Sequence, residues 1–127
     1  MANKTIQFKD GSDNIYPTIY ITKVNGSQSI TSGTTTSLTN TIAIGKGTWM
    51  ICAYVSWGIS STSSYNINVL WNGNMQRTVR ASMVNGGGAV NTVITAPTVD
   101  GTISVSVWQN SGSSATATYW IDAVKLA

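Results

Sequence analysis

The chain has 127 residues and a mass of 13.4 kDa, which allows one domain with a core of its own. Only 9% of its residues are charged: it has four Asp, five Lys and two Arg, but no Glu, no His and a single Cys. These counts exclude a Ser-His-Asp triad, a histidine metal cage, an internal disulfide and an iron–sulfur cluster. We therefore expect a protein that is not an enzyme and that holds neither a cofactor nor a metal.

The balance of side chains favours strands and argues against two classes of partner. Ile and Val together number 24 against three Leu, and β-branched residues pack well on a pleated sheet. The net charge is +3, but the seven basic residues are scattered rather than clustered, so we expect no nucleic-acid binding. No apolar run reaches the ~18 residues of a membrane span, and the first residues lack the apolar core of a signal peptide. We expect synthesis in a host cytoplasm and no membrane insertion.

In chain order, the first sixteen residues differ from the rest. Residues 5–9 alternate weakly as a short strand, and residues 10–14 (DGSDN) are a dense turn signal that ends the region near Pro17. Asp10 and Asp13 place oxygen ligands close together, so a hard-cation site is the alternative to a turn. We assign residues 1–35 to an attachment segment with the first strand or strands, and residues 36–127 to the domain proper.

From Tyr16 onward the pattern is strand, turn, strand, without a sustained helical period. A strand that starts at Ile19 is expected to turn at Asn25-Gly26, and a Thr-rich strand follows that carries Leu38, Ile42 and Ile44 on one face. Further strands are predicted at 47–57, 65–71, 75–83, 90–95, 103–108 and 117–124, with a hairpin at Asn72-Gly73. The sum is an all-β chain of about eight to ten antiparallel strands, typical of a sandwich or barrel.

Residues 47–57 form the clearest strand. Trp49, Ile51 and Val55 lie on one face, and Met50 and Tyr54 on the other, so this strand is expected to be central and covered on both sides. Cys52 falls between apolar neighbours and is expected to be a small buried side chain.

Four segments resemble the strands of complement/tumour-necrosis-factor-like jelly rolls. They are residues 47–55 (GTWMICAYV), 67–73 (INVLWNG), 100–107 (DGTISVSV) and 119–126 (YWIDAVKL). The resemblance covers about residues 36–127 and implies an antiparallel jelly-roll sandwich that forms compact homotrimers and recognises other molecules at the end of a fibre or stalk.

The first residues resemble the start of many tail-fibre and other virion proteins of phages and prophages. The match lies in residues 4–10 (KTIQFKD) and 14–17 (NIYP). The two resemblances together point to a phage virion protein, a head or tail fibre tip. The collagen-like or coiled-coil stalk usual in such proteins is absent, so the domain is expected to attach to other virion proteins directly or through residues 1–35.

The second faces of three strands predict the trimer interface. Side chains alternate along a strand, so residues that are out of phase with the core point to the opposite face. In the resembling family the equivalent sheet lines a threefold axis. The predicted interface residues are Met50, Tyr54, Trp108, Trp120, Val124 and Leu126.

Ligand binding is expected in the polar loops 58–64, 84–89 and 110–115, through Ser61, Asn85 and Asn110. Trp57 ends a strand beside one of these loops and is either the edge of the core or a platform for a sugar ring. Asp122 is expected to pair with Lys125, Arg77 or Arg80 rather than to catalyse a reaction. Arg77 and Arg80 should face opposite ways along their strand.

The sequence favours a non-catalytic receptor-binding module at a fibre tip, located in the virion, whose partner is a glycan or protein of the host surface. Two alternatives remain: a virion decoration protein with no receptor role, and a bacterial carbohydrate-binding or adhesin domain.

Overall fold

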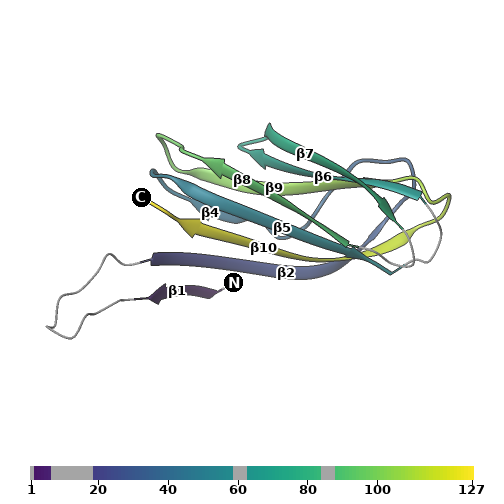
Figure 1. Ribbon diagram of the computed structural model, residues 1–127, viewed down its shortest axis with the longest axis horizontal. Helices are drawn as coiled ribbons and strands as arrows, with labels where there is room; N and C mark the ends of the chain where they lie inside the picture. Colours follow the sequence, from purple (N-terminus) through teal and green to yellow (C-terminus); the bar gives the residue numbers. More distant parts are fainter. Residues whose placement is uncertain (1, 7–18, 59–62, 84–87) are drawn as a thin grey trace, which may run out of the picture.

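The computed structural model describes residues 2–6, 19–58, 63–83 and 88–127. Every regular element in these ranges is a β-strand. The strands form two five-stranded antiparallel sheets that pack face to face as a β-sandwich (Figure 1). The all-β sandwich expected from the sequence is therefore confirmed.

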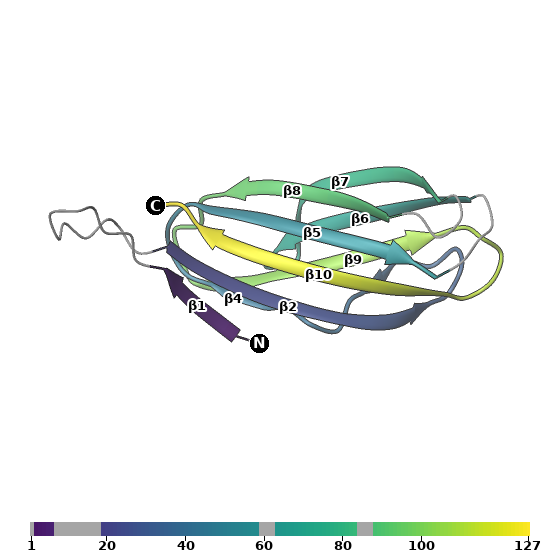
Figure 2. The same cartoon turned by 60° about the horizontal axis from the view of Figure 1, so that its bottom comes forward.

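The first sheet has the strand order β1-β2-β10-β5-β8, which is visible in Figure 2. Its strands are β1 (Ala2–Ile6), β2 (Ile19–Ile30), β10 (Ala115–Lys125), β5 (Trp49–Trp57) and β8 (Gly88–Thr95). The second sheet has the order β3-β9-β6-β7, with β4 also paired to β9. Its strands are β3 (Thr36–Ser37), β4 (Ile42–Ile44), β9 (Gly101–Gln109), β6 (Ser63–Trp71) and β7 (Asn74–Met83).

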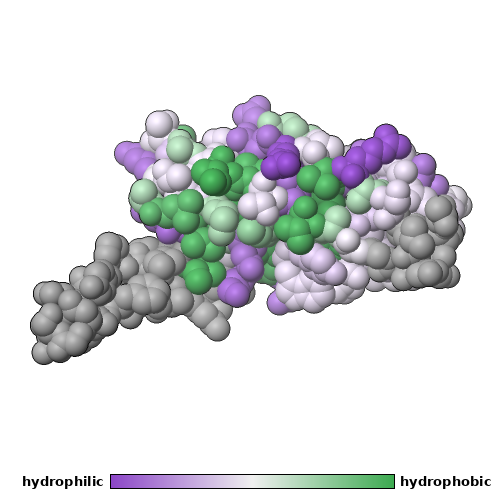
Figure 3. All heavy atoms as spheres, in the orientation of Figure 1, coloured by the Kyte–Doolittle hydropathy of each residue, from purple (hydrophilic) through white to green (hydrophobic). Residues whose placement is uncertain are grey.

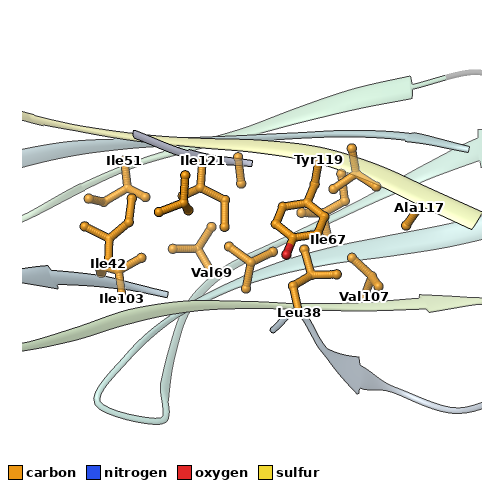
Figure 4. Close-up of a cluster of buried hydrophobic side chains, with 14 of the residues drawn as sticks. Leu38, Ile42, Ile51, Ile67, Val69, Ile103, Val107, Ala117, Tyr119 and Ile121 are labelled. Carbon is orange, nitrogen blue, oxygen red and sulfur yellow. The ribbon is translucent and has the colours of Figure 1, made fainter. Parts of the chain in front are cut away.

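The core lies between the two sheets and follows the period of two in each strand. Ile51 and Ile121 come from the first sheet, and Ile67, Val69 and Ile103 come from the second; each is at most 1% exposed. Figure 4 shows these side chains meeting between the two layers, with the ring of Tyr119 among them. This alternation leaves every second residue of both sheets on an outer face, where the candidate functional surfaces lie.

The hairpin predicted at Asn72-Gly73 is confirmed. Asn72 has φ 46° and Gly73 has φ 80°, the left-handed conformations that a type I′ turn requires. The Asn72 side chain also holds the neighbouring strand, because its Oδ1 accepts a 2.8 Å hydrogen bond from the Thr102 backbone N–H.

The turn predicted at Asn25-Gly26 is wrong, because β2 runs through these residues to Ile30. Gly26 lies opposite Tyr119 of β10. A Cβ at Gly26 would lie 2.8 Å from the Tyr119 hydroxyl oxygen, so this glycine makes room for a core phenol rather than for a turn. The Asn25 carbonyl accepts a 2.7 Å hydrogen bond from the Asn40 side chain.

Strand β2 belongs to the sandwich, although it lies within the 1–35 segment. It pairs with β10 along ten residues. It also places Val24 and Ile30 in the core, at 8% and 0% exposure.

Candidate functional site

The outer face of the first sheet carries an array of apolar side chains, which we call the apolar face. Its members are Ile21 from β2, Met50 and Tyr54 from β5, Val90 and Ile94 from β8, and Trp120 and Val124 from β10. Figure 3 shows apolar surface over β5, β8 and β10, in the orientation of Figure 1. These apolar side chains occupy outer positions that a solvated face would fill with polar residues.

The register aligns these side chains in two rows across the sheet. In one row, Val124 lies opposite both Ile21 and Met50, and Met50 lies opposite Ile94. Ile94 is 67% exposed. Leu126, at 52% exposure, follows β10 at the same end of the strand.

The second row is aromatic. Trp120 lies opposite Asn25 and Tyr54, and Tyr54 lies opposite Val90. The Tyr54 and Trp120 rings lie 5.4 Å apart at 45°, while 38% of Tyr54 and 45% of Trp120 remain exposed. Strand β5 is an inner strand, paired with β10 and β8, but its outer face is open in the single chain, contrary to the expectation that both sides are covered.

A polar row lies between the two apolar rows. Asp122 lies opposite Lys23 on one side and Cys52 on the other, and Cys52 lies opposite Thr92. Cys52 is partly exposed, so its predicted full burial is wrong. Lys23 faces Asp122 in the register, in place of the partners expected from the sequence.

A shallow hollow of about 270 Å³ borders Trp120. Asn25 and Ser27 of β2 and Thr118 and Trp120 of β10 surround it, over a floor at Gly26 and Tyr119. The Ser27 and Thr118 hydroxyl oxygens lie 3.1 Å apart, in hydrogen-bond contact. The hollow is therefore polar on one side and aromatic on the other.

The structure separates Trp108 from the other predicted interface residues. Trp108 is on β9 and projects from the outer face of the second sheet, whereas Tyr54 and Trp120 belong to the first sheet. Parity along β9 was predicted correctly, since Trp108 is out of phase with the buried Val105 and Val107. The alternation of side chains along one strand does not predict the sheet to which that strand belongs.

We call the outer face of the second sheet the polar face. Its middle is lined by amides and hydroxyls, and Asn68 donates a 3.0 Å hydrogen bond to the Ser106 hydroxyl. One row places Trp108, Asn66 and Arg80 side by side, because Asn66 lies opposite both of the others. The Arg80 Cζ lies 5.9 Å from the centre of the Trp108 ring, within the range of a cation–π contact. Arg77 points elsewhere and donates a 3.2 Å hydrogen bond to the Thr92 carbonyl, so the two arginines do diverge.

The four predicted ligand residues do not form one site among the described residues. Trp57 is 2% exposed and packs on Tyr65 at 5.4 Å, so it is core and offers no platform to a sugar. Asn110 is exposed, and its Oδ1 accepts a 2.7 Å hydrogen bond from the Ser64 N–H. Ser61 and Asn85 lie outside the described residues, as does most of loops 58–64 and 84–89.

Sequence reasoning missed the contribution of β2 and β8 to the apolar face. The signal was present in β8, where Val90 and Ile94 alternate with the buried Asn91 and Val93. Two apolar outer positions in one edge strand, next to the apolar outer positions of β5, favour a covered face.

Tyr65 is a titratable group enclosed in the core. Burial raises the pKa of its phenol above the ordinary 10.0, and the neighbouring Tyr54 adds to the rise. The Tyr65 hydroxyl has no hydrogen-bond partner among the described residues. This group is a buried polar atom of the core and takes no part in either outer face.

Within the described residues, no three His, Cys, Asp or Glu side chains gather as a metal site requires. The loop with Asp10 and Asp13 lies outside these residues. None of the described segments is a helix with the length and apolar character of a membrane crossing.

No protein-family model and no curated protein matches the sequence, so the geometry of the two outer faces carries the functional assignment.

Proposed function

We propose that the chain is a trimeric jelly-roll module of a phage virion, which uses its apolar face for self-association and recognises a ligand of the host surface. The observation that carries this proposal is the apolar face. A monomer in water would expose Tyr54, Trp120, Val90 and Ile94 on one sheet, and an apolar patch of this kind marks an interaction surface.

Strand pairing supports the jelly-roll part of the proposal. With β1 and the two-residue β3 set aside, the first strand pairs with the last, β2 with β10, and the pairs then nest inward: β4 with β9, β5 with β8, and β6 with β7. Nested pairing of this kind is what two Greek keys rolled together produce. It also agrees with the resemblance of residues 36–127 to complement/tumour-necrosis-factor-like domains.

Energetics supports a second copy as the cover of the apolar face. Tyr54 and Trp120 are already partly buried, at 38% and 45% exposure. Burying the area of each ring that is still exposed would contribute roughly 2 kcal/mol of favourable free energy to association, as judged from the area. The row of Ile21, Val124, Met50 and Ile94 adds further apolar area. Self-association through this face leaves the polar face outward, free to meet a receptor.

Five of the six predicted interface residues stay in the proposed interface. They are Met50, Tyr54, Trp120, Val124 and Leu126. Trp108 leaves it, because it projects from the opposite side of the sandwich. Other virion proteins would be held through the segment before Ile19.

Light scattering and thiol labelling test the assembly together. The wild type should scatter as three chains at tens of micromolar, and Tyr54→Ser with Trp120→Ser should scatter as one. Cys52 lies in the polar row between the two apolar rows and is the only cysteine, so maleimide labelling reports directly on this face. Labelling should be slow in the wild type and at least ten-fold faster in the double variant.

Trp108→Ser is the matched control, since it removes a tryptophan from the outer face of the other sheet. It should leave the mass and the Cys52 labelling rate unchanged. A wild type that remains monomeric at these concentrations contradicts the trimer and with it the family resemblance.

A monomer would favour the alternative of a carbohydrate-binding or adhesin domain. The hollow beside Trp120 is the specific observation for it, because an exposed indole next to Asn25, Ser27 and Thr118 offers both stacking and hydrogen bonds to a sugar. A trimer covers this hollow, so the oligomeric state decides between the two functions. A decoration protein would form the trimer but bind no host cells.

A further inference from the structure

We infer that the row of Trp108, Asn66 and Arg80 on the polar face is a binding site for an acidic sugar, a saccharide unit that carries a carboxylate. The inference rests on the proposed function, because it names the ligand class of the receptor-binding face. Three groups in this row each lack a partner of a particular kind.

The first is the Arg80 guanidinium, which has no anion among the described residues. Arg80 forms no ion pair within the described residues, where its side chain contacts the Trp108 ring. The described carboxylates lie elsewhere: Asp122 is on the other sheet, and Asp100 precedes β9 eight residues before Trp108, roughly 26 Å along the strand. A guanidinium that stacks on an aromatic ring keeps its N–H edge free to hold a carboxylate with two hydrogen bonds.

The second is the Asn66 side-chain oxygen, which has no donor among the described residues. Asn66 Oδ1 is buried and accepts no hydrogen bond from them. Asn66 lies between Trp108 and Arg80 in the register, so the Arg80 side chain must cross above it to reach the indole. A carboxylate that draws the guanidinium outward would open Oδ1 to a hydroxyl donor, which satisfies a buried acceptor.

The third is the Trp108 indole, half-buried on a face otherwise lined by amides and hydroxyls such as Asn68, Ser106 and Thr78. The C–H face of a pyranose ring packs on an indole, while its hydroxyls pair with the surrounding polar groups. An acidic sugar is one molecule that supplies all three missing partners: a carboxylate, a hydroxyl donor and an apolar ring face. An acidic peptide supplies the carboxylate but neither the ring face nor a set of hydroxyls.

Titration calorimetry with three probes tests the assignment on the assembled wild-type protein. Hyaluronan tetrasaccharide alternates glucuronate and N-acetylglucosamine, chitotetraose has N-acetylglucosamine alone, and a tetraglutamate peptide has the carboxylates without the sugar. We expect the hyaluronan tetrasaccharide to bind about ten-fold tighter than either of the others, because a charge-assisted bidentate contact is at stake. Equal binding of chitotetraose or the peptide, or no binding at millimolar hyaluronan tetrasaccharide, overturns the inference.

Variants then locate the site. Arg80→Gln should lower affinity for hyaluronan tetrasaccharide by about ten-fold and abolish the preference over chitotetraose. Asn66→Asp should do the same, since it sets a like charge beside the ligand carboxylate. Lys46→Gln is the charge-matched control on an exposed residue away from this row, and its affinity should stay within about two-fold of wild type. An Arg80→Gln protein that is folded by circular dichroism and binds as well as the wild type removes this row as the site.

Failure of this inference is distinct from failure of the proposed function. A trimer that binds host cells but not the acidic sugar overturns the site alone. A protein that binds the acidic sugar through Arg80 but stays monomeric overturns the trimeric assembly and leaves the site standing.

Discussion

The two outer faces of the sandwich have the same geometry and opposite chemistry. Each lies on the far side of strands that bury their alternate residues in one shared core. On β10 and β5 the outward positions are filled by residues such as Trp120, Val124 and Met50, whereas on β9 and β6 they are filled by Ser104, Ser106 and Asn68. The core therefore does not determine what an outer face carries.

The two faces differ in how far a single chain satisfies or covers their side chains. Asn68 and Ser106 are 6% exposed and hydrogen-bond to each other, so the middle of the polar face, unlike its Asn66 row, satisfies its own polar groups in the single chain. The apolar face stays partly uncovered in the single chain, because the Tyr54 and Trp120 rings contact each other and large fractions of both side chains remain exposed to water. The face whose apolar side chains remain exposed in the single chain is the one expected to contact another copy.

The largest effect is expected from placing the same charge on each of the two faces in turn. Val124→Lys puts an ammonium in one of the two apolar rows of the apolar face, where association would bury it at a cost of several kcal/mol. We expect a monomer by light scattering. Ser104→Lys puts the charge on the polar face and should leave the trimer intact. Equal masses of the two variants in solution would contradict the assignment of self-association to the apolar face.

A cavity in the core between the two sheets should destabilise both faces at once. Ile67 is 0% exposed, and Ile67→Ala leaves a cavity that should lower the free energy of unfolding by about 3–4 kcal/mol. Urea denaturation measures the loss. Thr41→Ala, at an exposed position between β3 and β4, should change stability by less than about 0.5 kcal/mol. An Ile67 variant as stable as the Thr41 variant would contradict the position of the core.

Crowding the glycine of β2 tests the first sheet from its core side. Gly26→Val places carbon against the Tyr119 hydroxyl, which a Cβ at this position would already approach to 2.8 Å. We expect a loss of about 1–3 kcal/mol, because the phenol or the strand must move. Ser29→Val puts the same side chain on an exposed position of the same strand and should cost little. Thermal unfolding of both variants makes the comparison, and a neutral Gly26→Val would mean that Tyr119 does not need this gap.

The smallest expected effect concerns Tyr65 and Tyr119, which are buried in the core. Because burial raises the pKa of Tyr65, the unfolded chain loses this proton near pH 10 while the folded chain keeps it. The stability linked to Tyr65 is therefore complete below about pH 10 and falls as the pH rises further. Tyr65→Phe should remove that alkaline loss.

At pH 7 Tyr65→Phe should be as stable as wild type, or up to about 1 kcal/mol more stable, since the described residues offer the hydroxyl no partner. Tyr119→Phe is the contrast, because the Tyr119 hydroxyl accepts a 3.3 Å hydrogen bond from the Asn40 backbone N–H. It should lose about 0.5–1 kcal/mol. Denaturation curves at pH 7 and above pH 10 distinguish these outcomes, and equal behaviour of the two variants would argue against the difference in partners.

Strand alternation alone determined much of this protein. It predicts the strands β5, β6, β8, β9 and β10 and the phase of each, and the Asn-Gly pair predicts the hairpin between β6 and β7. Phase is local, since a side chain's direction follows from its position in the strand. For this reason the sequence alone places Met50, Tyr54, Trp120 and Val124 out of the core.

The pairing of strands and the contacts between distant residues follow only from the tertiary structure. Which sheet a strand joins depends on pairing between distant segments, so Trp108 moved to the polar face, and Ile21 and Ile94 entered the apolar one. The role of Gly26 was hidden for the same reason: its missing side chain accommodates a phenol 93 residues away, and the local signal for a turn gave way to that long-range contact. Backbone preferences of a residue pair are worth about 1 kcal/mol, and the pairing of β2 with β10 along ten residues outweighs them.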